Sequence, residues 1–133
     1  MTTIFSKIID REIPSNFVYE DDVCVVIMDK FPAIEGQTVV IPKMEVDYAY
    51  DLPDDVYSHI FAVAKKIAKA SDKAFGAERT CLVVEGFEVP HVHIKLYPMK
   101  AARPALGEIM PQVAEKDDET LMTEAEKIKE NLE

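Results

Sequence analysis

The sequence predicts an α+β domain in which helices pack on an antiparallel sheet. A continuous apolar run, residues 23–28, is typical of a strand buried on both faces, and residues 38–41 are expected to form another strand. A third segment, residues 54–75, instead places apolar side chains at steps of three and four along one helical stripe. The shorter segments around them follow the order helix, strands, helix, strands, helix, which points to the α+β class.

The first part of the chain predicts a short helix and three strands. The helix falls within residues 3–10, with Thr2 or Thr3 as its N-cap and with four apolar residues at helical spacing, Ile4, Phe5, Ile8 and Ile9. Turn residues at 13–16 end this helix. Strands follow over 17–20, 23–28 and 38–41, and the last of them stops at Pro42.

The second part begins with the long helix over 54–75, and Gly76 is the expected C-terminal cap. A strand over 80–84, a turn over 86–90 and a strand from residue 91 onwards predict a hairpin, or two near neighbours in one sheet. The pattern weakens after Pro98. A charged helix is expected over 118–132, docked on the domain or on a partner subunit through a narrow stripe of Leu121, Ala125, Ile128 and Leu132.

Composition bounds the class of protein. The 133 residues, 48% of them hydrophobic, predict a single domain over 1–133 with a moderate core. A net charge of −10 argues against nucleic acid as a partner but leaves room for a small anionic ligand. We expect no membrane span, no secretory signal, and therefore a cytoplasmic protein. Cys24 and Cys81 lie in apolar runs and are expected to be buried and reduced.

The most informative stretch is 91–98. In an extended strand, His91, His93 and Lys95 would share one face at spacings of about 7 Å. Two imidazoles beside an ammonium group suit an anion, above all a phosphate that one imidazole attacks. Two alternatives remain: an ordinary polar strand face, or a metal site, for which a third ligand is missing and the lysine would repel the cation. Asp29, at the end of a buried strand, is either a loop cap or a ligand for ribose hydroxyls.

Residues 91–98 resemble the histidine triad (HIT) signature, in which histidines alternate with apolar residues. Residues 3–9, 11–14, 19–22 and 39–43 continue this resemblance in the family's order and spacing. It covers roughly residues 3–98 and is strongest for the Hint-like nucleotide-binding branch, which implies a domain core over 3–98 and a C-terminal extension over 99–133.

The resemblance implies a five-stranded antiparallel sheet and a homodimer that joins two such sheets. It implies a purine nucleotide (AMP- or GMP-like) as ligand, no cofactor, and hydrolysis at the α-phosphate of adenosine phosphoramidates, adenylates or dinucleoside polyphosphates. His93 would be the nucleophile that forms a nucleotidyl-histidine, His91 would support it, and Asp29 would contact the ribose. The base would be enclosed by Phe5, Ile8, Ile13 and Ile27.

The chain departs from the family pattern around the expected phosphate. Lys95 stands where the family has its third histidine, and a lysine keeps positive charge but does not readily exchange a proton near neutral pH. Val84 replaces a frequent asparagine, and Phe87 and Glu88 lie in a loop where relatives carry groups that reach phosphate. The alternative to a hydrolase is therefore a catalytically attenuated nucleotide-binding protein with a regulatory or interaction role.

The chain also departs from the zinc-binding relatives. Thr3 and Ser6 replace their Cys-x-x-Cys pair, and Glu45 replaces a common histidine. Hydroxyl oxygens are poor substitutes for thiolates as zinc ligands. We therefore expect no metal in this protein.

Overall fold

The structure is a computed structural model that describes residues 2–109 and 114–132. Its centre is a five-stranded antiparallel sheet in the order β1-β2-β3-β5-β4. The strands are β1 Phe17–Glu20, β2 Cys24–Met28, β3 Thr38–Pro42, β4 Arg79–Val83 and β5 Ile94–Met99. The helices are α1 Ile4–Ile9, α2 Asp54–Phe75, α3 Leu106–Ile109 and α4 Asp118–Glu130, with a 3-10 turn η1 at Ala49–Asp51. The predicted α+β class and antiparallel sheet are confirmed.

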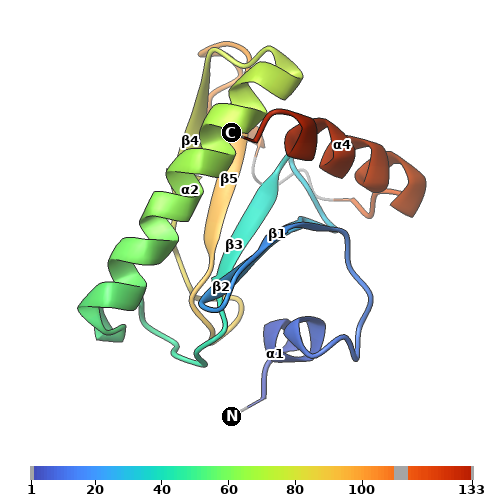
Figure 1. Cartoon of the computed structure of the whole chain (residues 1–133). Helices are drawn as coiled ribbons and strands as arrows, with labels where there is room; N and C mark the ends of the chain where they lie inside the picture. The colour runs from blue at the N-terminus through green and yellow to red at the C-terminus, as the bar shows by residue number, and fades with distance from the viewer. Residues whose placement is uncertain (1, 110–113, 133) are drawn as a thin grey trace.

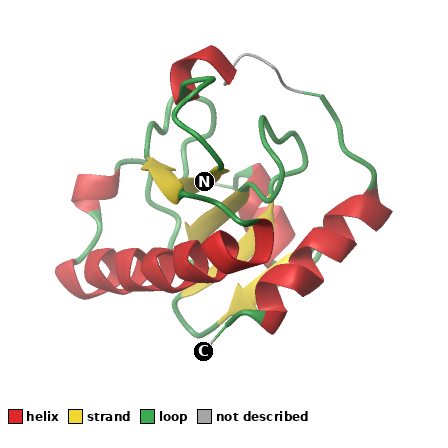
Figure 2. Cartoon of the chain, turned by 90° about the horizontal axis from the view of Figure 1, so that it is seen from above, coloured by secondary structure: helices red, strands yellow, loops and turns green. Residues whose placement is uncertain are grey.

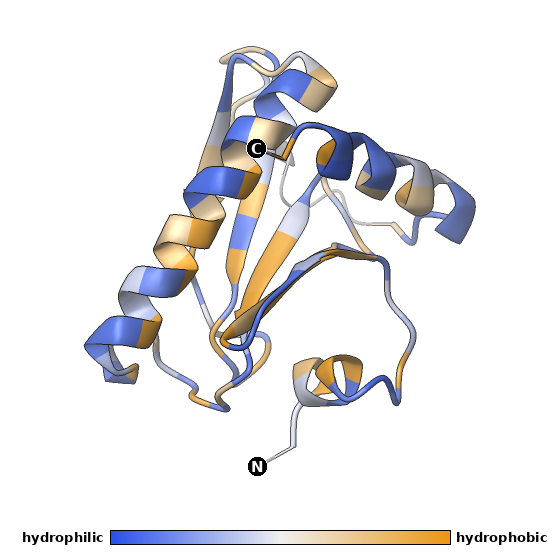
Figure 3. Ribbon diagram, viewed as in Figure 1, coloured by the Kyte–Doolittle hydropathy of each residue, from blue (hydrophilic) through white to orange (hydrophobic). Residues whose placement is uncertain are grey.

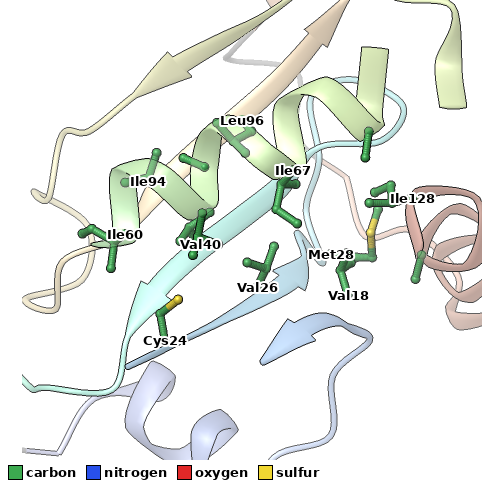
Figure 4. Packing of buried hydrophobic residues seen from close by; sticks show 14 of the residues in the cluster. Val18, Cys24, Val26, Met28, Val40, Ile60, Ile67, Ile94, Leu96 and Ile128 are labelled. Atoms are coloured by element: carbon green, nitrogen blue, oxygen red, sulfur yellow. The ribbon is translucent and has the colours of Figure 1, made fainter. Parts of the chain in front are cut away.

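The two faces of the sheet are covered by different helices. The long helix α2 lies across one face, and α4 packs beside it toward β1 and β2 (Figures 1 and 2). The opposite face receives α1, whose Ile8 packs with Val25 and Ile27 of β2. Alternate residues of β2, such as Val26 and Met28, join the core under α2 (Figure 4). Burial on both faces explains why β2 and β3 lack the polar alternation of a half-exposed strand.

The two predicted helix caps of α1 and α2 are present. Thr3 accepts a hydrogen bond from the backbone N–H of Ser6, and the Ser6 hydroxyl accepts one from the Thr3 backbone N–H, which forms a capping box. Gly76 ends α2 in the left-handed conformation with φ of 61°. Along α2, orange apolar and blue polar residues separate as expected for a helix with one buried face (Figure 3).

One strand boundary predicted from the sequence is wrong. The predicted strand began at His91, whereas β5 begins at Ile94. The backbone N–H groups of His91 and Val92 donate to the carbonyls of Val89 and Val46. These two N–H groups therefore bond to loops rather than to the backbone of β3 or β4. His91 and His93 therefore precede the strand, and they do not form a regular strand face with Lys95.

The C-terminal helix docks on its own chain. Leu121, Ala125 and Ile128 belong to the core under α2, and Leu132 packs against it. The sequence pattern did not predict that Glu124, on the same helix, is also buried, where its Oε1 accepts the Gly36 N–H at 2.7 Å. The irregular stretch predicted after Pro98 contains the short helix α3, and its residues 110–113 lie outside the described part.

Two further observations complete the fold. Both cysteines are free, and Cys24 is buried as predicted, whereas Cys81 is only partly buried, since its strand lies at the edge of the sheet. Among the described residues, no helix combines the length and the apolar character needed to cross a lipid bilayer.

Candidate functional site

A cavity of about 750 Å³ lies between α1, the ends of β2 and β5, and the start of α4. It gathers seven of the eight residues predicted for the site: Phe5, Ile8, Ile13, Ile27, Asp29, His93 and Lys95. The eighth, His91, does not line the cavity but is fully buried next to it. Residues separated by up to 90 positions in the sequence thus line one hollow.

His91 is held at both ring nitrogens. Its Nε2 lies 2.8 Å from the Pro42 carbonyl oxygen, and a carbonyl can only accept, so Nε2 carries the proton. Its Nδ1 lies 2.8 Å from the Thr3 hydroxyl, which in the neutral ring donates to the unprotonated nitrogen. The N-cap of α1 therefore also fixes the buried imidazole, and neither His91 nitrogen is left to meet a ligand.

His93 is fixed by the backbone of His91. Its Nδ1 lies 2.8 Å from the His91 carbonyl oxygen, so the proton sits on Nδ1 and the lone pair on Nε2. Burial lowers the pKa of His93 below its usual value, and the nearby Lys95 charge lowers it further. The Phe5 ring packs on the imidazole with centroids 4.9 Å apart. The side chain is thus a neutral imidazole with an available nitrogen, the form that a nucleophile requires.

Lys95 brings a cation to the same cavity. It lies in β5 between Val39 of β3 and Val83 of β4, and its ammonium group is 3.4 Å from the carboxylate of Glu88. Glu88 also lines the cavity and comes from the loop before β5. The Glu88 carboxylate, which would repel a phosphate if it were unpaired, is therefore paired with the lysine.

Asp29 lies in the cavity wall and also caps a loop. Its Oδ1 accepts the Phe31 N–H at 2.9 Å, and its Oδ2 accepts the side-chain amide of Gln37 at 2.6 Å. Gln37 is itself held, because its Oε1 accepts the Ala33 N–H at 2.7 Å. The two interpretations left open for Asp29 are thus compatible, since the carboxylate has lone pairs left for a ligand.

The end of the cavity toward α1 is apolar. Phe5, Ile8, Ile13 and Ile27 belong to one hydrophobic cluster on the α1 face of the sheet. Such a surface suits a flat aromatic group, whereas His93, Lys95 and Asp29 supply the polar groups that orient a ligand. The cavity therefore offers an apolar compartment joined to one with histidine, lysine and carboxylate.

The residues at the zinc positions of relatives form a hydrogen-bonded cluster. The hydroxyl oxygens of Thr3 and Ser6 lie 3.2 Å apart, and Thr3 also bonds to His91. The hydrogen bond from Ser6 lowers the pKa of Glu45. Since these hydroxyls already bond to one another and are weak zinc ligands, this donor set does not fit a structural zinc ion.

A second group has metal-like spacing. The ligand atoms of Asp21, Cys24 and His59 lie within 4.8 Å of one another. Asp21, however, already accepts hydrogen bonds from the backbone N–H groups of Val23 and Cys24 and pairs with His59. Burial raises the pKa of the Cys24 thiol to about 12, which opposes formation of a thiolate ligand.

Sequence reasoning missed several groups that shape the site. Thr3 was predicted only as a cap, and Gln37 carried no local signal for its contact with Asp29. Leu121 and Met122 of α4 line the cavity, although the sequence pattern placed that helix only as a tail. The Thr3–His91 contact and the position of α4 join segments far apart in the chain, and Gln37 meets Asp29 across an irregular loop, so no local pattern could have revealed them.

The fold and the cavity define an α+β protein with a histidine- and lysine-containing ligand site. Residues 10–101 match the model of the HIT domain, and the chain therefore belongs to the HIT-domain family. The antiparallel sheet with its flanking helices is also that of a solved Hit-like protein involved in cell-cycle regulation from Bartonella henselae. That structure has a TM-score of 0.88 and 31% identity, covering 98% of this chain and 96% of its own.

Two relatives carry an activity in their names. The adenosine 5'-monophosphoramidase of Saccharomyces cerevisiae is 32% identical over 77% of this chain and 66% of its own length. The adenylylsulfatase of Arabidopsis thaliana is 32% identical over 73% of this chain but only 52% of its own length. A HIT-like protein of Methanocaldococcus jannaschii is 35% identical, over 71% of this chain and 77% of its own. The family thus includes hydrolases that act on adenosine 5'-phosphate derivatives.

Proposed function

We propose that this protein is a nucleotide-binding hydrolase that cleaves at the α-phosphate of adenosine phosphoramidates or adenylates through a nucleotidyl-histidine. One observation carries the proposal: His93 lies in the cavity as a neutral imidazole whose proton is held on Nδ1 by the His91 carbonyl. That bond leaves Nε2 free to attack phosphorus. The yeast phosphoramidase, similar over most of this chain, supports the same substrate class.

The cavity provides a compartment for each part of the nucleotide. The base occupies the apolar end, with Phe5 and Ile27 among its walls. The ribose hydroxyls donate to Asp29, whose carboxylate is oriented by Gln37. The α-phosphate then lies near His93 and Lys95, and the ammonium group stabilises the charge on its oxygens.

The reaction proceeds in two displacements. The Nε2 lone pair of His93 forms a bond to phosphorus, and the bond to the leaving group breaks. For a phosphoramidate, the electron pair goes to the leaving nitrogen, which takes a proton from water. Positive charge develops on the imidazole, and the His91 carbonyl, 2.8 Å from Nδ1, stabilises it. The amine departs at this stage. Water then attacks phosphorus and gives its proton to the hydroxide formed in the first step. The P–Nε2 bond breaks, its electron pair returns to the imidazole, and AMP is released.

The proposal is tested by AMP release from an adenosine phosphoramidate. We expect His93→Ala to abolish turnover, because it removes the ring nitrogen that forms the covalent bond to phosphorus. His59→Gln is the matched control, since this histidine lies outside the cavity and pairs with Asp21. Turnover that survives His93→Ala, or a wild-type protein that neither binds AMP in calorimetry nor releases it, would contradict the proposal.

The alternative, an attenuated nucleotide-binding protein, has one observation in its favour. The Lys95 charge is paired with Glu88, which weakens its hold on a phosphate. Restoring a histidine by Lys95→His distinguishes the two functions. A large gain in turnover would identify the natural chain as attenuated, whereas an unchanged or lower rate supports Lys95 as a working member of the site.

We further propose that the protein forms a homodimer through the free edge of β4. Within the described part of the chain, this strand pairs with β5 alone, and Leu82 on it is 44% exposed. Tyr48, Tyr50 and Phe87 are also largely exposed and line a hollow together with Leu82. Apolar side chains gathered at an unpaired strand edge favour association. Sedimentation should give twice the monomer mass for the wild type and for Leu82→Met, and the monomer mass for Leu82→Glu.

A further inference from the structure

Glu88 is a carboxylate within the candidate site that the proposed mechanism does not use. It lies on the loop before β5, lines the same cavity as His93, and its side chain is 75% exposed. Its partner Lys95 is more enclosed, with 22% of the side chain exposed. Glu88 therefore stands nearer the mouth of the cavity than the ammonium group to which it is paired.

The positions of the base and the ribose in the cavity determine which part of the substrate lies next to Glu88. The apolar end toward α1 suits the base, and Asp29 suits the ribose. The leaving group beyond the α-phosphate then takes the remaining, solvent-facing side, where Glu88 lies. When the α-phosphate binds Lys95, it compensates the lysine charge, and Glu88 becomes the uncompensated charge at the mouth.

We propose, resting on the function proposed above, that Glu88 makes the site select leaving amines that carry a positive charge. An ammonium group on the leaving amine replaces Lys95 as the partner of Glu88. An anionic leaving group, such as a carboxylate-bearing amine, sulfate or a phosphate chain, is repelled. The preferred substrates are therefore adenosine phosphoramidates of diamines or of basic amino acids, rather than adenylyl sulfate or dinucleoside polyphosphates.

The expected size of the effect follows from the exposure of Glu88. One exposed charge pair is worth roughly a 1.5- to 5-fold change in an equilibrium. A substrate with a negative leaving group loses this attraction and gains a repulsion of similar size, so the factor applies twice. The kcat/KM values of the positive and the negative substrate should therefore differ by roughly 2- to 25-fold. The difference should shrink at high salt, because ions screen exposed charges.

The test uses three adenosine 5'-phosphoramidates of equal chain length: those of 1,5-diaminopentane, pentylamine and 5-aminopentanoate. In the wild type, kcat/KM should fall in that order. Glu88→Gln should bring the three values together, and Glu119→Gln, a matched loss of charge on α4 outside the cavity, should keep the wild-type order. Equal values in the wild type, or an unchanged order in Glu88→Gln, would overturn the inference.

Binding measurements test the role of Glu88 independently of the proposed hydrolase activity. If the wild type hydrolyses none of the three compounds, the proposed hydrolase fails. The dissociation constants of the same compounds for His93→Ala then still decide the role of Glu88. The order diamine, pentylamine, aminopentanoate supports charge selection, and equal constants refute it.

Discussion

The Thr3 hydroxyl links the start of α1 to the buried histidine, so Thr3→Val gives the sharpest test of the structural reasoning. Valine keeps the shape of threonine but removes the oxygen that accepts from Ser6 N–H and bonds to His91 Nδ1. Loss of an N-cap costs about 0.5–2 kcal/mol. A buried ring nitrogen left without its partner costs about 1–3 kcal/mol. Since one hydroxyl makes both bonds, we expect the free energy of unfolding to fall by about 2–4 kcal/mol.

Urea and thermal unfolding measure this loss. With about 2.1 cal/mol/K of unfolding entropy per residue over 133 residues, Tm should fall by roughly 7–14 °C. Thr3→Ser keeps the hydroxyl and should remain close to the wild type. The reasoning is refuted if the valine variant unfolds within about 0.5 kcal/mol of the serine variant, a difference near the limit of such measurements. It is also refuted if nitrogen NMR finds the His91 proton on Nδ1 rather than Nε2.

Three further predictions concern the loop before β3 and the nucleophile. Gly36→Ala should lower the free energy of unfolding by about 2–4 kcal/mol, because φ is 81° and the new Cβ would lie 2.4 Å from the Phe75 ring. A loss of less than about 1 kcal/mol in chemical unfolding would contradict this packing. Gln37→Leu should weaken AMP binding in calorimetry, since Asp29 loses its orienting amide; unchanged affinity would remove Asp29 from the ribose site. The value of kcat/KM should fall as pH falls, with a midpoint below about 6.5, because burial lowers the pKa of His93 and only the neutral ring attacks. A midpoint above about 7 would contradict the buried environment of His93.

The local sequence pattern was sufficient where burial repeats along one element. The apolar run of β2, the short segment of β3 before Pro42 and the stripe of α2 are local patterns, so the ends of these elements were predicted within one residue. The start of β5 was not, because alternation of histidine with apolar residues continues through residues 91–93 while their backbone bonds go to loops. Alternation reports which side chains are buried, not which strand the backbone pairs with.

In the candidate site, too, local sequence patterns revealed some features and not others. The sequence identified His93, Lys95 and Asp29 as residues with the right chemistry, and the resemblance to the HIT family supplied their expected roles. It gave no sign of the Glu88 pairing, of Gln37 behind Asp29, or of α4 in the cavity wall. Each of these contacts joins segments that are far apart in the chain or lie on an irregular loop.

The sequence by itself therefore determined the fold class, the main elements and the family, because periodic burial and motif spacing are local properties of the chain. Only the tertiary structure decided the state of the imidazoles. A histidine becomes a neutral nucleophile when burial disfavours its charged form, and a hydrogen bond from Nδ1–H to a carbonyl then leaves the lone pair on Nε2. Here burial and the nearby Lys95 charge lower the pKa of His93, and the His91 carbonyl, which accepts from Nδ1–H, fixes the tautomer.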